Sequence, residues 1–128
     1  MSKPTLRWYA KGDFAKSKKY LRKLHTKKFQ NVLIKYASYG LDALKAATPK
    51  ETGYTAESWY ADVEIGETTG VIYWKNSYYN KGYPIAIIVD IGHGTRNGGY
   101  VKPRNYIEPA LKPVLKELNE AVKREVVS

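Results

Sequence analysis

The most regular hydrophobic pattern in the chain predicts a long helix between Thr26 and Pro49. Apolar residues recur there at steps of three and four positions, which places them on one face of a helix. Thr26 suits the N-cap, and Pro49 ends the helix because it forces Thr48 out of the helical region. Gly40 lies on the apolar face and predicts a close backbone approach by another element. The other residues of this face are Phe29, Val32, Leu33, Tyr36, Ala43, Leu44 and Ala47.

The residues before this helix predict a short strand and a basic helix. Residues 5–9 are rich in branched and aromatic side chains, so residues 1–12 are expected to form an N-terminal arm or edge strand. Asp13 suits an N-cap, and apolar residues at helical spacing follow it. Residues 13–47 are therefore predicted to form two helices. The basic face at the start of this region consists of Lys16, Lys19, Arg22, Lys23 and Lys27.

Residues 57–91 are predicted to form three strands. Residues 58–65 alternate between apolar and polar side chains, which is typical of a half-buried strand. Residues 71–75 form the second strand, which pairs antiparallel with the first as a hairpin. Residues 85–91 are the most apolar run in the chain and are predicted to be a third strand. The core-facing positions of the first and third strands are Trp59, Ala61, Val63, Ile65, Ile85, Ile87, Val89 and Ile91.

A glycine-rich loop, residues 92–104, follows and leads to a C-terminal helix, residues 105–125. Pro113 lies within the helical pattern, so the helix either begins near Lys112 or bends at the proline. The whole chain, residues 1–128, is expected to be one α+β domain in the order β-α-α-β-β-β-α. An antiparallel sheet of three to four strands would pack against the long helix and the C-terminal helix.

The net charge of +10 is concentrated in the first half of the chain. Residues 1–50 contain thirteen Lys and Arg and only two acidic residues, whereas residues 51–128 contain nine basic and ten acidic residues. This asymmetry favours an acidic partner or nucleic acid near the N-terminal half, and a solvated lysine face is the alternative. The chain has no cysteine, and its apolar runs are too short to span a membrane. We therefore expect no membrane contact.

Twelve tyrosines give a second indication of binding. A cluster near the second strand lies among lysines, and such a cluster is typical of a stacking platform for single-stranded nucleic acid or of a protein–protein interface. We favour the interface, because the excess of basic residues lies elsewhere in the chain and a stacking platform needs both. The cluster consists of Tyr73, Tyr78, Tyr79 and Tyr83.

The candidate chemical motifs do not indicate an enzyme. The glycines of residues 92–99 lack the Gly-Lys-Ser/Thr ending of a phosphate-binding loop, and no helix begins among them as in a dinucleotide fold. His25 and His93 are the only histidines, which does not suit a catalytic zinc site or a serine triad. Asp62 and Glu64 share the outer face of one strand rather than a cleft. We expect no catalytic residues, cofactor or metal, and treat a hydrolase that uses His93 as remote.

Two segments resemble the paired signatures of a known family. Thr48-Pro-Lys-Glu-Thr-Gly53, followed by Ser58-Trp59, resembles a Pro-x-x-Thr-Gly signature between a long helix and a strand. Pro84-Ile-Ala-Ile-Ile, the glycine loop and Tyr106-Ile-x-Pro-Ala110 resemble the matching C-terminal signature. Together they are similar to the neck or tail-completion proteins of long-tailed bacteriophages, which are also described as head–tail joining or minor structural proteins. The likeness covers residues 12–125.

The resemblance implies a structural virion protein that forms a ring at the head–tail junction and surrounds the DNA channel. Its partners would be copies of itself, the head connector, the tail-terminator or tail-tube proteins, and genomic DNA through non-specific contacts. It would reside in the host cytoplasm during assembly and then in the virion neck. The signature positions would be Thr48, Pro49, Thr52, Gly53, Ser58, Trp59, Gly92, Gly94, Gly98 and Gly99.

Two functional hypotheses follow from the sequence. In the first, the chain builds the ring, and the glycine loop orders on assembly or faces the channel or tail. The loop residues that would then contact a neighbour or DNA are His93, Arg96, Lys102 and Arg104. In the second, the chain is a nucleic-acid-binding module that uses its basic N-terminal half.

Overall fold

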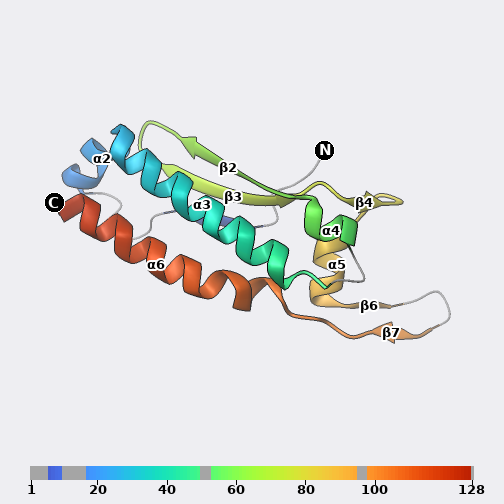
Figure 1. Cartoon of the computed structure of the whole chain (residues 1–128). Coiled ribbons are helices and arrows are strands. Elements are labelled where there is room, and N and C mark those ends of the chain that lie inside the picture. The colour runs from blue at the N-terminus through green and yellow to red at the C-terminus, as the bar shows by residue number, and fades with distance from the viewer. Residues whose placement is uncertain (1–5, 10–16, 50–52, 95–97, 128) are drawn as a thin grey trace.

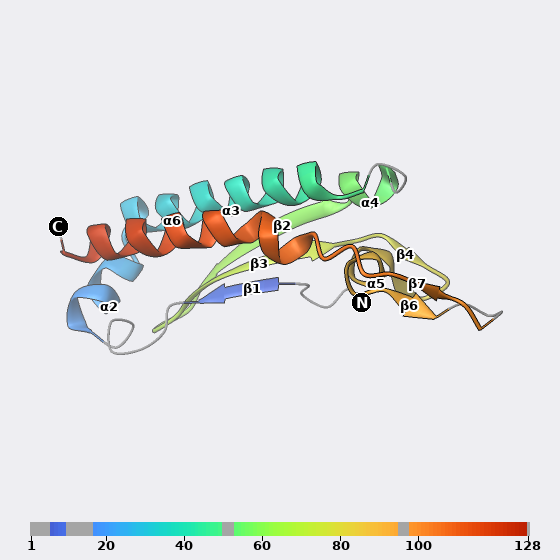
Figure 2. The same ribbon diagram turned by 90° about the horizontal axis from the view of Figure 1, so that it is seen from below.

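Two long helices cover one face of a small antiparallel sheet, and short elements gather at one end of the molecule (Figure 1, Figure 2). This computed structural model describes residues 6–9, 17–49, 53–94 and 98–127. The mixed α+β class expected from the sequence is confirmed. The observed element order is β1-α2-α3-α4-β2-β3-β4-β5-α5-β6-β7-α6, which contains more short elements than we predicted.

The sheet has three strands in the order β1-β3-β2. β2 (Trp59–Ile65) and β3 (Gly70–Asn76) form the predicted antiparallel hairpin. β1 (Leu6–Tyr9) pairs antiparallel with the other side of β3, so the N-terminal segment is an edge strand. Buried and half-buried residues alternate along β3, because one face of the sheet packs against the helices and the other does not.

The long helix α3 (Lys27–Ala47) has the predicted boundaries. The Thr26 side chain accepts a hydrogen bond from the Phe29 amide, and Thr48 is the C-cap. Gly40 also has its expected role: a Cβ atom there would lie 2.6 Å from a ring carbon of Trp74. Only glycine lets the helix approach the sheet so closely. α6 (Ile107–Val127) runs through Pro113, so the alternative start near Lys112 is wrong.

The first helix, α2 (Lys18–Leu24), begins later than predicted. Its N-cap is Ser17, whose side chain accepts a hydrogen bond from the Tyr20 amide at 3.1 Å. Serine and aspartate are similarly effective N-cap residues, so the sequence alone did not distinguish Ser17 from Asp13. Asp13 and Lys16 lie outside the described residues.

The predicted third strand, residues 85–91, is wrong: this segment is the helix α5 (Ile85–Ile91). A seven-residue apolar run does not distinguish a strand from a helix, and its Ile and Val residues favour a strand. The decisive signals flank the run. Pro84 is the N-cap, and Gly92 follows the helix with a φ of 79° and donates its amide to the Ile88 carbonyl at 2.8 Å. Proline before a helix and glycine after it are ordinary boundary signals.

The sequence also left several short elements unpredicted. The helix α4 (Gly53–Glu57) comes between α3 and β2 in the chain. β4 (Tyr79–Asn80) and β5 (Tyr83–Pro84) form a tight hairpin whose turn residues Lys81 and Gly82 both have positive φ. β6 (His93–Gly94) and β7 (Tyr100–Val101) pair antiparallel inside the predicted glycine loop.

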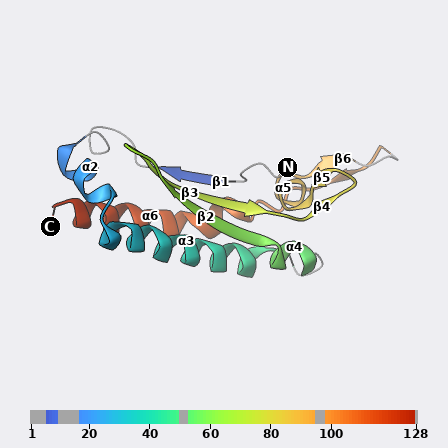
Figure 3. The ribbon, with the colours of Figure 1, turned by 90° about the horizontal axis from the view of Figure 1, so that it is seen from above.

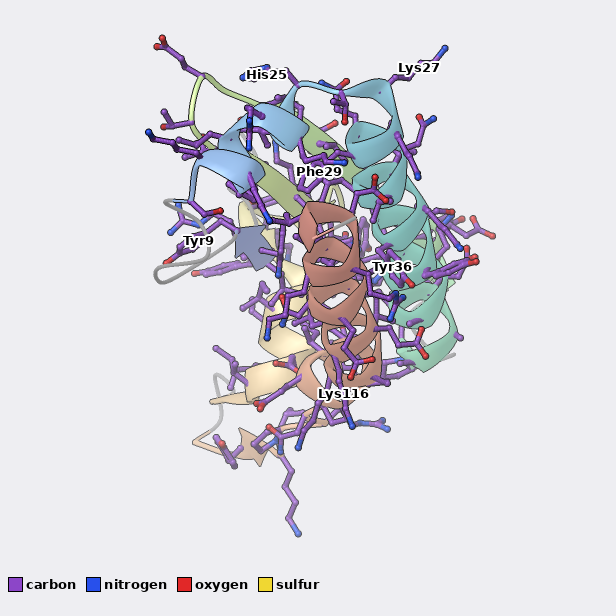
Figure 4. The ribbon with its side chains drawn as sticks, turned by 90° about the vertical axis from the view of Figure 1, so that its left-hand side faces the viewer. Tyr9, His25, Lys27, Phe29, Tyr36 and Lys116 are labelled. Carbon is purple, nitrogen blue, oxygen red and sulfur yellow. The ribbon has the colours of Figure 1, made fainter. Side chains whose placement is uncertain are left out.

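The hydrophobic core lies between the sheet and the two long helices. Trp74 is its largest fully buried side chain, and its indole nitrogen donates to the Ala37 carbonyl at 2.9 Å. In Figure 4, Tyr36 lies between α3 and α6, and Phe29 lies between α2 and α3. No helix in the described part of the chain is both long and apolar enough to cross a bilayer. Other core residues are Trp8, Tyr20, Leu24, Leu33, Leu44, Trp59, Ile72, Leu111, Leu118 and Val122.

Candidate assembly site

The two signature segments meet beside the C-terminal end of α3. Thr48 is buried there, and its hydroxyl donates to the Leu44 carbonyl at 2.6 Å. The same oxygen accepts a hydrogen bond from the indole nitrogen of Trp59 at 2.9 Å. The Thr48 side chain also lies close enough to Tyr106, from the second signature, to lower the pKa of its phenol. One threonine therefore connects α3, the start of β2 and the start of α6.

Tyr106 also connects this junction to α5. Its hydroxyl donates to the Ala86 carbonyl at 2.9 Å, and both residues are buried. Burial and, to a smaller extent, the negative charge of Asp90 raise the pKa of Tyr106 to about 12, although the side chain of Thr48 acts in the opposite direction. The phenol is thus held in its neutral form, in which it can donate a hydrogen bond to the Ala86 carbonyl.

Asp90 holds the segment before α6 against the end of α5. Its side chain accepts a hydrogen bond from the Ile107 amide at 3.0 Å, at the first residue of α6. Its backbone carbonyl accepts one from Asn105, and the Val89 carbonyl accepts one from Arg104. Asp90 belongs to α5, yet it accepts a hydrogen bond from a backbone amide at the start of α6. An N-cap residue of α6 would ordinarily have this role.

The hairpin formed by β6 and β7 projects from this junction, and we call residues 92–104 the arm. In Figure 1 the strands β6 and β7 extend beyond α5, away from α3 and α6. Gly92 lies at its base, where a Cβ atom would come within 2.6 Å of the Val101 carbonyl oxygen and 2.8 Å of the Pro103 nitrogen. The backbone segments that begin and end the arm are therefore in close contact at its base.

The described residues of the arm are largely exposed. Tyr100 is 65% exposed and Val101 is 41% exposed. His93, Lys102 and Arg104 are also exposed, so the structure places three of the four predicted loop residues on one projection. Arg96 lies outside the described residues. Gly94, Gly98 and Gly99 are exposed in the arm as well, and Gly98 has a positive φ.

An open groove of about 690 Å³ lies beside the base of the arm. Residues of α5, of the β4–β5 hairpin and of β6 line it; these elements lie together at one end of the molecule (Figure 3). Exposed apolar and aromatic side chains belong to these elements and to β7, which is a feature of interaction surfaces. They are Tyr79, Tyr83, Ile91, Tyr100 and Val101.

The basic face predicted from the sequence lies at the opposite end of the molecule. A smaller groove of about 340 Å³ is lined there by Lys19, Arg22, Lys23, Thr26 and Val126. Figure 4 shows Lys27 pointing outward from the start of α3 at this end. The basic face is therefore a surface separate from the arm, and the two can contact different partners at the same time.

The remaining signature positions have local structural contacts. The Ser58 hydroxyl donates to the Tyr54 carbonyl at 2.6 Å, and the Ser58 carbonyl accepts the Ser77 amide at 3.1 Å. Pro49 is half-buried after the end of α3, and Gly53 begins α4. Thr52 lies outside the described residues.

Asp90 and Asn76 are the structurally important polar residues that sequence reasoning missed. The Asn76 amide donates to the Thr55 carbonyl at 2.8 Å, and its oxygen accepts the Tyr78 amide at 2.9 Å. Both residues come at the end of an apolar segment and could have been recognised as chain-capping positions, but their partners are distant in sequence. The sequence contained no signal that identified those partners.

The two histidines do not form a common site. His25 shares a 3.0 Å hydrogen bond with the Glu67 carbonyl at the turn between β2 and β3, whereas His93 lies on the arm at the other end. Among the residues that the structure describes, no group of three or more His, Asp and Glu side chains is arranged to hold a metal ion.

The fold and the site define a small α+β protein with a projecting arm that is basic and apolar. No family model, curated protein or solved structure matches the chain.

Proposed function

We propose that this chain is a structural virion protein that assembles as a ring at the head–tail junction of a bacteriophage, joins the connector to the tail and surrounds the DNA channel. The convergence of the two signature segments supports this proposal most directly. Trp59 donates a hydrogen bond to Thr48, Tyr106 donates one to Ala86, and Thr48 lies beside Tyr106, although these residues come from segments far apart in the sequence. Residues that the resemblance marks as structural thus support the base of the arm.

The surface of the molecule agrees with a role in assembly rather than in turnover. Five of the nine exposed large hydrophobic side chains in the described part of the chain lie at the arm end, where a monomer would leave them in water. A ring needs two different complementary surfaces on each subunit, and the molecule has different surfaces at its two ends. In this proposal the protein has no catalytic role, resides in the virion neck, and is present in the host cytoplasm during assembly.

Native mass spectrometry and negative-stain electron microscopy of the purified chain test the proposal. We expect a closed oligomer with rotational symmetry, and we expect the chain to bind purified connector or tail-tube protein. A monomer at all concentrations that binds neither partner would refute the ring.

Nucleic-acid binding by the basic N-terminal half is the second candidate, and the groove beside Lys19, Arg22 and Lys23 favours it. These cations would bind phosphates without reading the base sequence, so affinity should fall steeply with salt. A fluorescence titration with double-stranded DNA should show weaker binding and a smaller salt dependence for Arg22→Ala. Lys116→Ala, which removes one exposed charge from α6, is the matched control. No binding at low salt would exclude this candidate.

A further inference from the structure

The arm and the β2 edge of the sheet are complementary in charge. From residue 91 to residue 107 the sequence has three Lys and Arg residues and no acidic residue. From residue 53 to residue 74 it has four acidic residues and no Lys or Arg. The second segment contains β2, an edge strand whose Asp62 and Glu64 side chains are exposed.

β2 has one side available for a further strand. It pairs with β3 on one side only, and none of the strands that the structure describes pairs with the other side. Asp62 is already bound to Lys75 at 3.1 Å. Glu64 forms no ion pair within the described part of the chain, and neither does Lys102 of the arm. The side chains of Glu64 and Lys102 are therefore both available for contact between molecules.

The arm lacks the packing that a stable hairpin needs. Its strands β6 and β7 have two residues each, and an isolated two-stranded hairpin is only marginally stable in water. Tyr100 and Val101 remain largely exposed, although side chains of these types gain most from burial. An additional strand would supply both the missing hydrogen bonds and an apolar contact.

We propose that the arm of one subunit lies along the free edge of β2 in a second copy of the chain. Lys102 then lies beside Glu64 of the neighbour, and Tyr100 and Val101 pack against the uncovered face of its sheet, where Tyr73 and Val71 are half-exposed. The basic face of α2 is a poorer occupant of this edge, because none of its described residues is a large exposed hydrophobic side chain. DNA would be repelled by the acidic edge.

This contact gives the proposed ring its interface, and so it rests on the proposed function. The arm and the β2 edge are different surfaces, so the contact is head-to-tail, and repetition closes a ring when the rotation allows it. An assembly in which the arm bound a second arm would instead form a two-fold dimer.

Charge reversal tests the contact. Lys102→Glu and Glu64→Lys should each weaken self-association by about tenfold or more, because each places like charges together, and the double variant should restore it. Association is measured by native mass spectrometry at several concentrations, after circular dichroism confirms folding. Lys116→Glu on α6 is the control for an exposed charge change and should leave association unchanged. If the wild type forms rings and both single-reversal variants form them equally well, the arm contact is overturned and the proposed ring remains intact.

Disulfide trapping extends the test to weak association, because the wild-type chain has no cysteine. Tyr100→Cys protein mixed with Glu64→Cys protein should give a cross-linked dimer under mild oxidation. Tyr100→Cys mixed with Ser38→Cys, on the exposed face of α3, should not. Preferential cross-linking to the Ser38→Cys protein would overturn the contact. A wild-type chain that stays monomeric, together with cysteine variants that show no preference, would overturn the contact and also refute the ring.

Discussion

The body of the molecule and its arm end are held together in different ways. The body comprises β1, β2, β3, α3 and α6, and its large side chains such as Trp74, Leu33 and Leu118 are fully buried. The arm end comprises β4, β5, α5, β6 and β7, and among its described residues only Ala86 belongs to the buried hydrophobic core. The arm end is positioned by hydrogen bonds from residues 104–107 and by Ile87 and Val89, which are only partly buried where they pack against the core.

This difference indicates a division of roles. Apolar burial is the main source of folding stability, so the body determines whether the chain folds. The arm end leaves Tyr83, Ile91 and Tyr100 exposed, which contributes little to the stability of a monomer but provides surface for association. Substitutions in the two regions should therefore affect different measurements.

Trp74→Ala should give the largest effect on stability. It removes the largest fully buried side chain and leaves a cavity against α3, so the free energy of unfolding should fall by about 3–5 kcal/mol. Urea unfolding followed by circular dichroism measures the change. Tyr100→Ala, which truncates an exposed aromatic residue of the arm, should change stability by less than about 0.5 kcal/mol. Similar losses from both variants would remove the distinction between the two regions.

The sequence predicted the body better than the arm end, and the reason is physical. α3 is long, with matching caps and a regular apolar face, so local signals agreed with one another at Thr26, Gly40 and Thr48. The β2–β3 hairpin followed from its strict alternation. In each case the residues that determine the element are close together in the chain.

At the arm end the determining contacts are distant in sequence. The run 85–91 has strand propensity but folds as a helix, with its end fixed by the amides of Arg104 and Asn105. The segment predicted to be a glycine loop contains paired strands, and this likewise depends on a contact between residues apart in the sequence, His93 and Val101. The signature residues were identified by resemblance, but only the structure shows that Thr48 and Tyr106 meet.

High pH should weaken the junction between the two regions. The pKa of Tyr106 is raised from 10 to about 12 in the folded protein, so the unfolded chain loses this proton first and stability falls as pH rises between these values. A shift of this size corresponds to roughly 2–3 kcal/mol. Urea unfolding at pH 9 and at pH 12 measures the fall.

Tyr106→Phe is the control for this prediction. Its stability at pH 9 should be lower, because the hydrogen bond to the Ala86 carbonyl is lost, but its fall towards pH 12 should be smaller than in the wild type. Tyr20 and Lys75 also have raised pKa values, through burial and through the hydrogen bond to Asp62 respectively, and both contribute to the fall in the two proteins. Equal falls in the two proteins would show that Tyr106 is not the group that responds.

Two glycines with the same φ of 79° test how firmly the arm is attached. Gly92→Ala combines an unfavourable backbone conformation with a Cβ atom placed 2.6 Å from the Val101 carbonyl, and should reduce the free energy of unfolding by about 2 kcal/mol. Gly98→Ala also places alanine at a positive φ, but nothing lies within 4 Å of its Cβ position. Its loss should be about 1 kcal/mol or less.

The difference between these two variants separates backbone strain from contact at the base of the arm. Amide hydrogen exchange should show faster exchange at Gly92, Arg104 and Asn105 in Gly92→Ala but not in Gly98→Ala, because only the first displaces the two chains where they leave the body. Protection in α3 and β3 should be less affected in both variants. If Gly98→Ala instead destabilised the protein as much as Gly92→Ala, the arm would be coupled to the body along its length, and its base would not be the point of attachment.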